Sequence, residues 1–288
     1  MMRQIIHGDC VQVLPALPEK FARLIYVDPP FNTGKMQSKT TIRSTSSKNG
    51  VRNGFGGRKY DTEVIAKIGY VDKFDDYVEE FLMPRIKMSL RCLTDDGSIF
   101  VHLDYREVHY VKVAMDRLLG RDHFMNEIIW AYDFGGRSKK RWAAKHDTIL
   151  WYAMNPDNYV FNFEEIKRIP YMAPGLVSVE KAKRGKVPTD TWWHTIVPTN
   201  GKEKTGYPNQ KPLGILNRII LAHSNKGDTV LDFFAGSGST AYASAELGRD
   251  FVMVDSNKKA IDIMRNRLDE FNPYIMSECK VSRAYATL

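Results

Sequence analysis

A short apolar strand that runs into a glycine turn lies close to the C-terminus, and its position constrains the fold more than any other feature. The segment reads Val230-Leu231-Asp232-Phe233-Phe234-Ala235-Gly236-Ser237-Gly238-Ser239-Thr240. Glycines in such a turn let a ligand approach the backbone, and the helix that follows offers free N–H groups at its start. We therefore predict a ligand-binding strand–turn–helix unit here.

Only one clear strand, Phe251–Val254, follows this turn, so a doubly wound sheet cannot be completed downstream. The other strands must come from the N-terminal part, which rearranges the strand order relative to an ordinary nucleotide-binding fold. The strand before Asp9 can then take the third place in the ligand-binding half. Asp9 and Cys10 would lie at its C-terminal edge, where open α/β sheets bind ligands. Asp255, after the last strand of this half, can accept hydrogen bonds from ribose hydroxyls.

Short apolar runs alternate with helical patterns along the rest of the chain, which predicts an α/β fold with a mostly parallel sheet. The predicted strands are Gln4–His7, Arg23–Val27, Ser98–Leu103, Glu127–Tyr132, Thr148–Ala153, Thr229–Leu231 and Phe251–Val254. The predicted helices are Asp75–Leu93, Glu107–Leu119, Pro212–His223, Thr240–Leu247 and Lys258–Phe271. A length of 288 residues suits one such domain with an elaboration.

Two segments break this alternation. Residues 35–57 are rich in Ser, Thr, Gly, Lys and Arg with few apolar residues, so we expect a long mobile loop, extending over 33–72 with its flanks. Residues 155–204 have no clear period and predict a small, irregular insertion. The remaining segments, 1–154 and 205–288, would form two parts of one domain, the second carrying the glycine turn.

Composition adds weaker constraints. The formal net charge of +8 favours a polyanionic partner. No apolar run is long enough to cross a bilayer, and the N-terminus reaches a charged turn too early for a signal peptide, so we expect a cytoplasmic protein. The three cysteines, Cys10, Cys92 and Cys279, are widely spaced and predict neither a disulfide framework nor a metal site.

A strand from Leu24 to Val27 runs into Asp28-Pro29-Pro30-Phe31. The two prolines restrict the backbone and donate no hydrogen bonds, which predicts a stiff turn at the strand's C-terminal edge. Asp28 and the carbonyl of Pro29 can then serve as rigid acceptors for the N–H bonds of an exocyclic base amine, and Phe31 can stack on the extruded base. Direct transfer of an activated methyl group to that amine needs mainly positioning and electrostatic complementarity. We predict that Asp28, Pro29, Pro30 and Phe31 are catalytic.

In combination and order, these motifs resemble the β-class amino methyltransferases of bacterial and phage DNA, in which the catalytic motif precedes the cofactor motif. The matching segments span most of the chain and are Gly8-Asp9-Cys10, Asp28-Pro29-Pro30-Phe31-Asn32, Asp96 to Asp104, Trp130 to Tyr152, Gly206 to Pro212, and Asp232 to Thr240. The resemblance implies a Rossmann-like methyltransferase fold, with a doubly wound, mostly parallel sheet, one antiparallel strand, a circularly permuted motif order and a small insertion. It also implies S-adenosylmethionine as the cofactor and a homodimer.

By the same resemblance, Asp9 contacts the cofactor adenine, Asp255 the ribose and Asp232 the methionine moiety, and Lys211 and Pro212 belong to the helix start that closes over the methionine end. The full predicted cofactor set is Asp9, Cys10, Lys211, Pro212, Asp232, Phe233, Phe234, Ala235, Gly236, Ser237, Gly238, Ser239, Thr240 and Asp255. Asn209 and Ser239 stand where family members usually or often have Thr, a departure that bears on cofactor affinity and not on the class.

Three basic clusters predict contacts to double-stranded DNA. The first follows the catalytic motif and contains Lys35, Lys39, Arg43, Lys48, Arg52, Arg58 and Lys59. The second lies between two predicted strands and contains Arg137, Lys139, Lys140, Arg141 and Lys145. The third, in the insertion, contains Lys181, Lys183, Arg184 and Lys186. We place target recognition in residues 155–204, where Trp192 and Trp193 are either DNA contacts or core anchors. His102 and His146 are expected to be structural.

The leading hypothesis is methyl transfer to adenine N6, because an Asp at the first position of the catalytic motif resembles the adenine-specific enzymes, whereas cytosine-N4 enzymes more often have Ser. The same fold acting on cytosine N4, on RNA or on a protein amide stays open. A non-catalytic DNA-binding protein with a relict pocket is an alternative from a different class, disfavoured by the intact Asp28, Gly236 and Gly238. The glycine motif nearly fits the NAD fingerprint as well, but its position near the C-terminus disfavours a NAD-dependent oxidoreductase.

Overall fold

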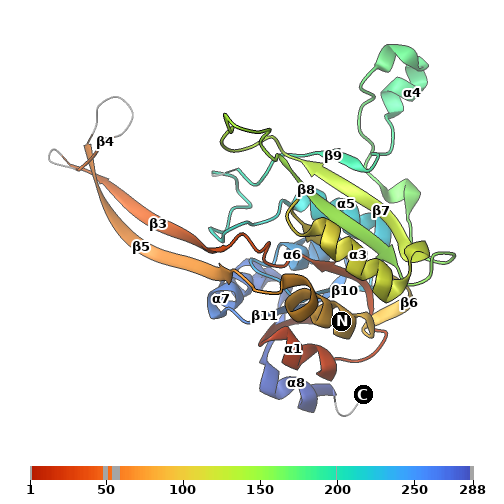
Figure 1. Ribbon diagram of the computed structural model, residues 1–288, viewed down its shortest axis with the longest axis horizontal. Coiled ribbons are helices and arrows are strands. Elements are labelled where there is room, and N and C mark those ends of the chain that lie inside the picture. The colour runs from red at the N-terminus through yellow and green to blue at the C-terminus, as the bar shows by residue number, and fades with distance from the viewer. Residues whose placement is uncertain (1, 48–50, 54–58, 199, 286–288) are drawn as a thin grey trace.

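A nine-stranded sheet forms the centre of the computed structural model, which describes residues 2–47, 51–53, 59–198 and 200–285. The order across this sheet is β12-β1-β11-β10-β2-β6-β8-β7-β9 (Figure 1). Its strands are β1 Arg3–His7, β2 Ala22–Val27, β6 Leu93–Leu103, β7 Phe124–Ala131, β8 His146–Ala153, β9 Thr191–Trp193, β10 Thr229–Asp232, β11 Asp250–Asp255 and β12 Tyr274–Ser277.

All neighbouring strands of this sheet pair in parallel except β8, which is antiparallel to both β6 and β7. The predicted α/β fold, a mostly parallel sheet with one antiparallel strand, is therefore confirmed. Strand β1 pairs with β11, and β11 pairs with β10. Strand β1 therefore takes the third place in the ligand-binding half, as its position in the sequence predicts.

Helices cover both faces of the sheet. Apolar side chains along β2 point alternately to the two faces, so both faces need to be covered. Ile25 and Val27 point into one core, with α1, α2, α3 and α8. Leu24 and Tyr26 point into the other, with α5 and α6. Helix α7 packs on this second face, in a third cluster over β1 and β11. The helices are α1 Cys10–Val13, α2 Met83–Leu90, α3 Val108–Leu119, α4 Val179–Arg184, α5 Leu213–His223, α6 Ser239–Glu246, α7 Lys258–Arg267 and α8 Glu278–Tyr285. A π-helical segment, Tyr77–Leu82, leads into α2.

Residues 33–72 are expected from the sequence to form a long mobile loop without strands, and that absence of strands is wrong. Strands β3 Lys35–Ser46 and β5 Lys59–Asp72 form a long antiparallel hairpin, with the short β4 Arg52–Asn53 beside β5, and Figure 1 shows this hairpin projecting far from the sheet. Pairing runs from Lys35 opposite Asp72 to Ser46 opposite Tyr60. The hairpin projects into solvent, and its described side chains are mostly exposed. No apolar/polar alternation is therefore needed, and the sequence signal for strands is lost.

The insertion at 155–204 is irregular, as expected, but carries the short helix α4 and the edge strand β9. Adjacent side chains of a strand point to opposite faces, so the two neighbouring tryptophans of β9 face in opposite directions. Trp192 is buried against Arg218 of α5 and donates from its indole N–H to the carbonyl of Thr189 at 2.7 Å, whereas Trp193 is 73% exposed. Trp192 is a core anchor, and Trp193 faces solvent.

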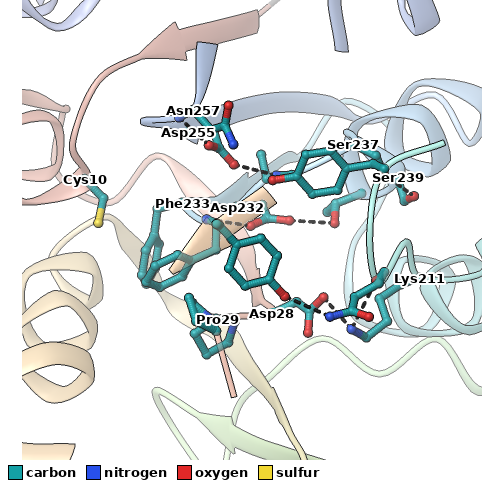
Figure 2. Close-up of a pocket in the computed structure, with 18 of the residues that line it drawn as sticks. Cys10, Asp28, Pro29, Lys211, Asp232, Phe233, Ser237, Ser239, Asp255 and Asn257 are labelled. Atoms are coloured by element: carbon teal, nitrogen blue, oxygen red, sulfur yellow. Dashed lines mark hydrogen bonds and ion pairs between the residues drawn. The ribbon is translucent and has the colours of Figure 1, made fainter. Parts of the chain in front are cut away.

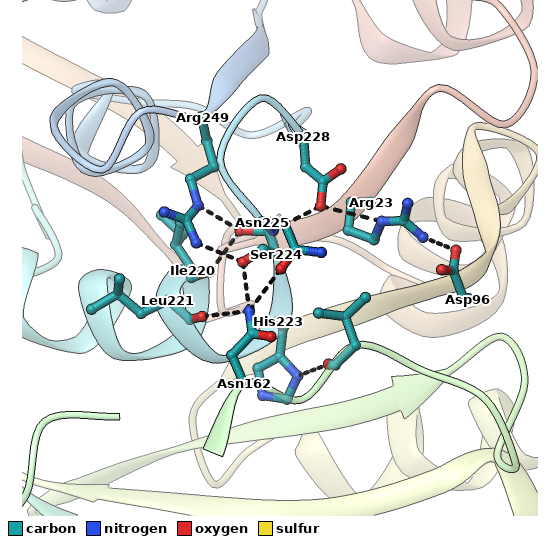
Figure 3. A network of polar contacts seen from close by, with 11 residues as sticks. Arg23, Asp96, Asn162, Ile220, Leu221, His223, Ser224, Asn225, Asp228 and Arg249 are labelled. Atoms are coloured by element: carbon teal, nitrogen blue, oxygen red, sulfur yellow. Dashed lines mark hydrogen bonds and ion pairs between the residues drawn. The ribbon is translucent and has the colours of Figure 1, made fainter. Parts of the chain in front are cut away.

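A polar network joins Asn162 of the insertion to the C-terminal end of α5 and to Arg249, which precedes β11 (Figure 3). The side-chain amide of Asn162 donates to the carbonyls of Leu221 at 3.2 Å and Ser224 at 2.9 Å, at the end of α5. The buried Arg249 donates to the same Ser224 carbonyl at 2.6 Å and to the Ser224 hydroxyl at 3.1 Å. These donors satisfy carbonyl groups that the end of a helix leaves without partners. Among the helices of the described residues, none is long and apolar enough to cross a membrane.

Candidate active site

Four carboxylates follow four neighbouring parallel strands at one edge of the sheet. In the order β1-β11-β10-β2, the strands lead to Asp9, Asp255, Asp232 and Asp28. Because parallel strands end at the same edge, residues far apart in the sequence meet there. Figure 2 shows Asp28, Asp232 and Asp255 along this edge, with the glycine turn beside them.

These residues line a cavity of about 340 Å³. Most of the predicted site lies in its wall, namely Asp9, Cys10, Asp28, Pro29, Pro30, Phe31, Lys211, Asp232, Phe233, Phe234, Ala235, Gly236, Ser237, Ser239, Thr240 and Asp255. Pro212 and Gly238 do not line it. The wall also contains residues that sequence reasoning missed, among them Tyr26, Tyr70, Phe74, Phe81, Arg85, Tyr207, Gln210 and Asn257.

The motif Asp28-Pro29-Pro30-Phe31, predicted to be catalytic, continues directly from β2, and its carboxylate is already paired. Lys211 Nζ lies 2.5 Å from Asp28 Oδ2, and the same ammonium lies 4.9 Å from the centroid of the Phe31 ring. Asp28 Oδ1 is buried and has no hydrogen-bond partner among the described residues. One oxygen of the carboxylate is therefore held by the chain, and the other is left as an acceptor.

Behind Phe31 lies a buried polar network. The ring of His102 stacks on Phe31, with centroids 6.1 Å apart, and is itself fully buried. Its Nδ1 lies 2.7 Å from the hydroxyl of Tyr26, and its Nε2 lies 3.2 Å from Asp147 Oδ2. Tyr132 donates to the other oxygen of Asp147 at 3.2 Å. This network supports Phe31 from the core side, which is a structural role for His102.

The glycine turn is shaped by two carboxylates that accept from backbone groups. Asp255 Oδ2 accepts from the N–H of Gly236 at 2.8 Å, and its Oδ1 accepts from the N–H of Asn257 at 2.8 Å. Asp232 accepts from the Phe234 N–H at 3.0 Å and from the Thr240 hydroxyl at 2.7 Å. Asp232 therefore ties the end of β10 to the first turn of α6 as well as lining the cavity.

Both glycines of the turn have backbone angles that other residues rarely adopt, with φ +52° at Gly236 and +72° at Gly238. A Cβ on Gly236 would lie 3.2 Å from the ring of Tyr207, which covers the turn. A Cβ on Gly238 would lie 2.6 Å from Met264 Cγ of α7. Gly236 thus keeps space at the cavity wall, whereas Gly238 lets α6 pack closely on α7.

Burial shifts the ionisation of the site. Burial raises the pKa of Asp232 to about 7, although the hydrogen bonds from Thr240 and Phe234 oppose the shift. Burial likewise raises the pKa of Asp255 to about 6, against the hydrogen bonds from Asn257 and Gly236. The pKa of the Cys10 thiol is raised to about 12, again chiefly by burial, so Cys10 is a neutral wall residue and not a nucleophile.

Asp9 and an aromatic cluster form the far end of the cavity. Asp9 caps helix α1, accepting from the Val11 N–H at 3.0 Å, and lies 3.9 Å from the guanidinium of Arg85. Arg85 in turn covers the ring of Phe81 at 4.3 Å, and Phe81 stacks on Phe74 with centroids 4.0 Å apart. An end walled by flat aromatic rings, with charged groups beside them, suits a planar heterocycle.

The base of the hairpin also reaches the cavity. The hydroxyl of Tyr70 on β5 accepts from the side-chain amide of Asn209 at 2.8 Å. The carbonyl of the preceding Gly69 accepts from the side-chain amide of Asn257 at 3.3 Å. The hairpin is thus fastened to both sides of the cavity, which the sequence alone did not indicate.

The basic residues predicted to contact DNA lie in three places. Lys35 and Lys59 are exposed at the two ends of the hairpin's long strands; Lys39 and Arg43 belong to β3, and Arg58 lies outside the described residues. The loop 133–145 follows β7 at the same sheet edge as Asp28 and exposes Arg137, Lys139, Lys140 and Arg141. Helix α4 exposes Lys183 and Arg184.

Lys145 differs from the other members of its cluster. Its ammonium donates to the carbonyls of Phe134 at 2.6 Å and Gly136 at 2.8 Å. Lys145 therefore shapes the loop 133–145 from within. The same loop exposes a large ring, because Trp142 is 98% exposed.

The strand order, with carboxylates at the C-terminal ends of neighbouring parallel strands, defines an α/β fold of the nucleotide-binding class. Comparison with known proteins gives the family. The chain belongs to the DNA methylase family (N6_N4_Mtase), which matches residues 22–266. It is 28% identical over 275 residues to the type II methyltransferase M.HpaI of Haemophilus parainfluenzae, covering 95% of this chain and 77% of M.HpaI. It is 28% identical over 284 residues to the DNA adenine methyltransferase YhdJ of Escherichia coli, covering 96% of this chain and 86% of YhdJ.

Two solved structures share the fold. The complex of M1.HpyAVI with S-adenosylmethionine has a TM-score of 0.59 and 21% identity, with 93% of this chain and 100% of that chain covered. The cytosine-N4-specific PvuII DNA methyltransferase has a TM-score of 0.62 and 14% identity, with 99% and 92% covered. The predictions of a Rossmann-like methyltransferase fold and of a member of the DNA methyltransferases are confirmed.

Proposed function

We propose that this protein transfers a methyl group from S-adenosylmethionine to the N6 amine of an adenine that is flipped out of double-stranded DNA. The observation that carries the proposal is the position of Asp28-Pro29-Pro30-Phe31. The motif ends β2, the immediate neighbour of β10, so it lies at the rim of the same cavity as the glycine turn. The name of the relative YhdJ, a DNA adenine methyltransferase, supports adenine as the target.

The cavity fits the cofactor. Asp255 at the end of β11 is suited to accept from ribose hydroxyls, the cluster of Phe74, Phe81 and Arg85 is suited to a flat base, and Gly236 leaves space beside the backbone. We assign the adenine end to the side of Asp9 and the methionine end to the side of Asp232. When bound, S-adenosylmethionine supplies an activated methyl group on a sulfonium.

The residues of the catalytic motif then prepare the acceptor. The lone pair of an exocyclic amine is delocalised into the base ring, which makes the nitrogen a weak nucleophile. The Asp28 carboxylate, whose Oδ1 has no hydrogen-bond partner among the described residues, accepts one N–H of the amine, and the Pro29 carbonyl is the second acceptor. Holding both N–H bonds favours a pyramidal nitrogen with a freed lone pair. Phe31, supported from behind by His102, stacks on the base.

DNA binding is assigned to surfaces around the rim of the cavity. Residues 35–72 carry eight Lys or Arg against three Asp or Glu, and the loop 133–145 and helix α4 add exposed cations. Because the hairpin and the loop 133–145 flank the edge that bears Asp28, DNA held between them would present a flipped base to the cavity. Target recognition by the insertion 155–204 belongs to the proposal, with the exposed Trp193 as its aromatic contact. We also propose a cytoplasmic location and a homodimer.

Cytosine N4 is the second candidate target, because the family that matches the chain is named for both amines. The two reactions use the same acceptors and differ in the base that the pocket admits. Asp28 at the first position of the motif favours adenine.

Activity is tested by incubating the protein with unmethylated genomic DNA and S-adenosylmethionine carrying a labelled methyl group. Label in the DNA, lost in Asp28→Asn by about 10²-fold or more while cofactor binding persists, is the expected result. Lys226→Ala, an exposed position before the start of β10 and so at the opposite end of that strand from Asp232, is the matched control. No incorporation into any DNA would instead support a DNA-binding protein with a relict pocket. Wild-type turnover in Asp28→Asn would refute the role given to the carboxylate.

A further inference from the structure

The two oxygens of Asp28 have unlike surroundings, and this asymmetry has a single source. Oδ2 accepts from Lys211 Nζ at 2.5 Å, whereas Oδ1 is buried with no hydrogen-bond partner among the described residues. A carboxylate beside a cavity can rotate about its terminal bond and exchange its oxygens. The contact with Lys211 restricts that rotation and holds the carboxylate in one orientation.

Lys211 is itself held in one place. Its side chain is 8% exposed, and its ammonium lies 3.5 Å from the carbonyl of Asn209 and 4.9 Å from the centroid of Phe31. A buried ammonium is stable only with such partners, so Asp28 and Phe31 fix the position of Lys211. Lys211 in turn restrains the side chains of Asp28 and Phe31. Figure 2 shows the side chains of Lys211 and Asp28 meeting, although their segments lie 183 residues apart in the sequence.

We propose that Lys211 is a positioning residue for the acceptor amine. It holds the carboxylate of Asp28 in one orientation, ready to accept an N–H of the target base. It also holds Phe31, on which the base stacks. The inference rests on the proposed function and deepens it, because it assigns Lys211 to the acceptor side of the cavity, whereas the family resemblance places it on the methionine side.

The chemistry of the two substrates favours this assignment. The cofactor carries a positive sulfonium, so an unpaired ammonium beside it would repel it. When the ammonium is paired with Asp28, the negative carboxylate offsets its positive charge, and it donates an N–H to that carboxylate. A charged lysine has no lone pair to take a proton from the amine, so its contribution is orientation and not base catalysis.

The test compares Lys211→Met, Lys211→Ala and Lys211→Arg with Lys226→Met, which removes an exposed lysine far from the cavity. Three quantities are measured for each, namely the S-adenosylmethionine dissociation constant by calorimetry, the DNA dissociation constant, and the single-turnover rate of methylation. Lys211→Met is expected to lower the single-turnover rate about 10²-fold, the cost of a misplaced catalytic group, while the cofactor dissociation constant changes less than about threefold. Lys211→Arg is expected to recover part of the rate. Lys226→Met is expected to match the wild type.

Chemical rescue separates orientation from folding. Methylammonium added to Lys211→Ala restores a donor at Asp28 Oδ2 and is expected to raise the rate saturably, whereas tetramethylammonium, which has the charge without N–H donors, is not. An unchanged single-turnover rate in Lys211→Met overturns the inference. So does a loss of cofactor affinity as large as the loss of rate, or an equal response to both ammonium ions. A wild-type protein that methylates no DNA overturns the proposed function, and the inference with it, before any variant is compared.

Discussion

Cofactor affinity is predicted to depend on pH through Asp255. Its two oxygens accept from the backbone of Gly236 and Asn257, and burial raises its pKa to about 6. Ribose hydroxyls donate to the ionised carboxylate, so cofactor binding favours the ionised form, and a protonated Asp255 must lose its proton before the cofactor binds. With the free group half protonated at pH 6, binding there releases about half a proton, and at pH 5 roughly a tenth of the protein carries the ionised group.

The sign and size of the effect follow. Affinity is expected to be constant well above pH 7 and to fall as pH falls through 6, by about tenfold per pH unit, which is about 1.4 kcal/mol. Asp232, whose pKa is about 7, can add to the slope, so the comparison that isolates Asp255 is the variant Asp255→Asn. This variant binds more weakly at pH 8 and loses one proton's worth of pH dependence below pH 6.

Isothermal titration calorimetry of S-adenosylmethionine between pH 5 and 8, in two buffers of different ionisation enthalpy, measures both affinity and proton release. An affinity that stays flat over this range would refute the reasoning. The same conclusion would follow if Asp255→Asn kept the full slope of the wild type, because the titrating group would then lie elsewhere.

Three further variants test the framework of the site. Gly238→Ala places a Cβ against α7 at a positive φ and is expected to lower the free energy of unfolding by about 1–3 kcal/mol, measured by urea denaturation. Gly136→Ala, where a Cβ meets no atom of the described residues within 4 Å, is its control, and equal losses in the two would contradict the packing argument. Arg249→Ala removes the donors to Ser224 and is expected to cost about 2–4 kcal/mol of unfolding free energy without changing cofactor affinity, so an unaltered denaturation midpoint would speak against the network. Arg141→Ala, in the loop 133–145, is expected to weaken binding to all DNA sequences alike and to reduce the salt dependence of the binding constant by about one unit, whereas a sequence-selective loss would show that it reads bases.

The sheet could be predicted because its central strands are buried on both faces. Ile25 and Tyr26 are both fully or almost fully buried, on opposite sides, so β2 is a continuous apolar run that stands out in the sequence. The edge strand β12 was missed, because Tyr274 and Ile275 are partly exposed and the run is short and mixed. The hairpin was missed for a related reason, since strands surrounded by solvent need no apolar pattern.

The candidate site was predicted where its residues are contiguous in the sequence. The motif from Asp28 to Phe31 and the glycine turn could both be recognised locally. Arg85 and Tyr70 could not, because each reaches the cavity from an element whose position depends on the packing of the whole domain. The pairing of Lys211 with Asp28 is of this kind too. Both residues were predicted to belong to the site, but their contact joins segments that only the folded sheet brings together.

The nucleoside that gains the methyl group tests the central claim most directly. Unmethylated DNA is incubated with the protein and S-adenosylmethionine, digested to nucleosides and analysed by mass spectrometry, with Asp28→Asn as the blank. N6-methyldeoxyadenosine that appears with the wild-type protein and is absent from the blank is the predicted result. N4-methyldeoxycytidine as the sole product would contradict the assignment of adenine, and the absence of any methylated nucleoside would contradict the account of this cavity as a methyltransferase site.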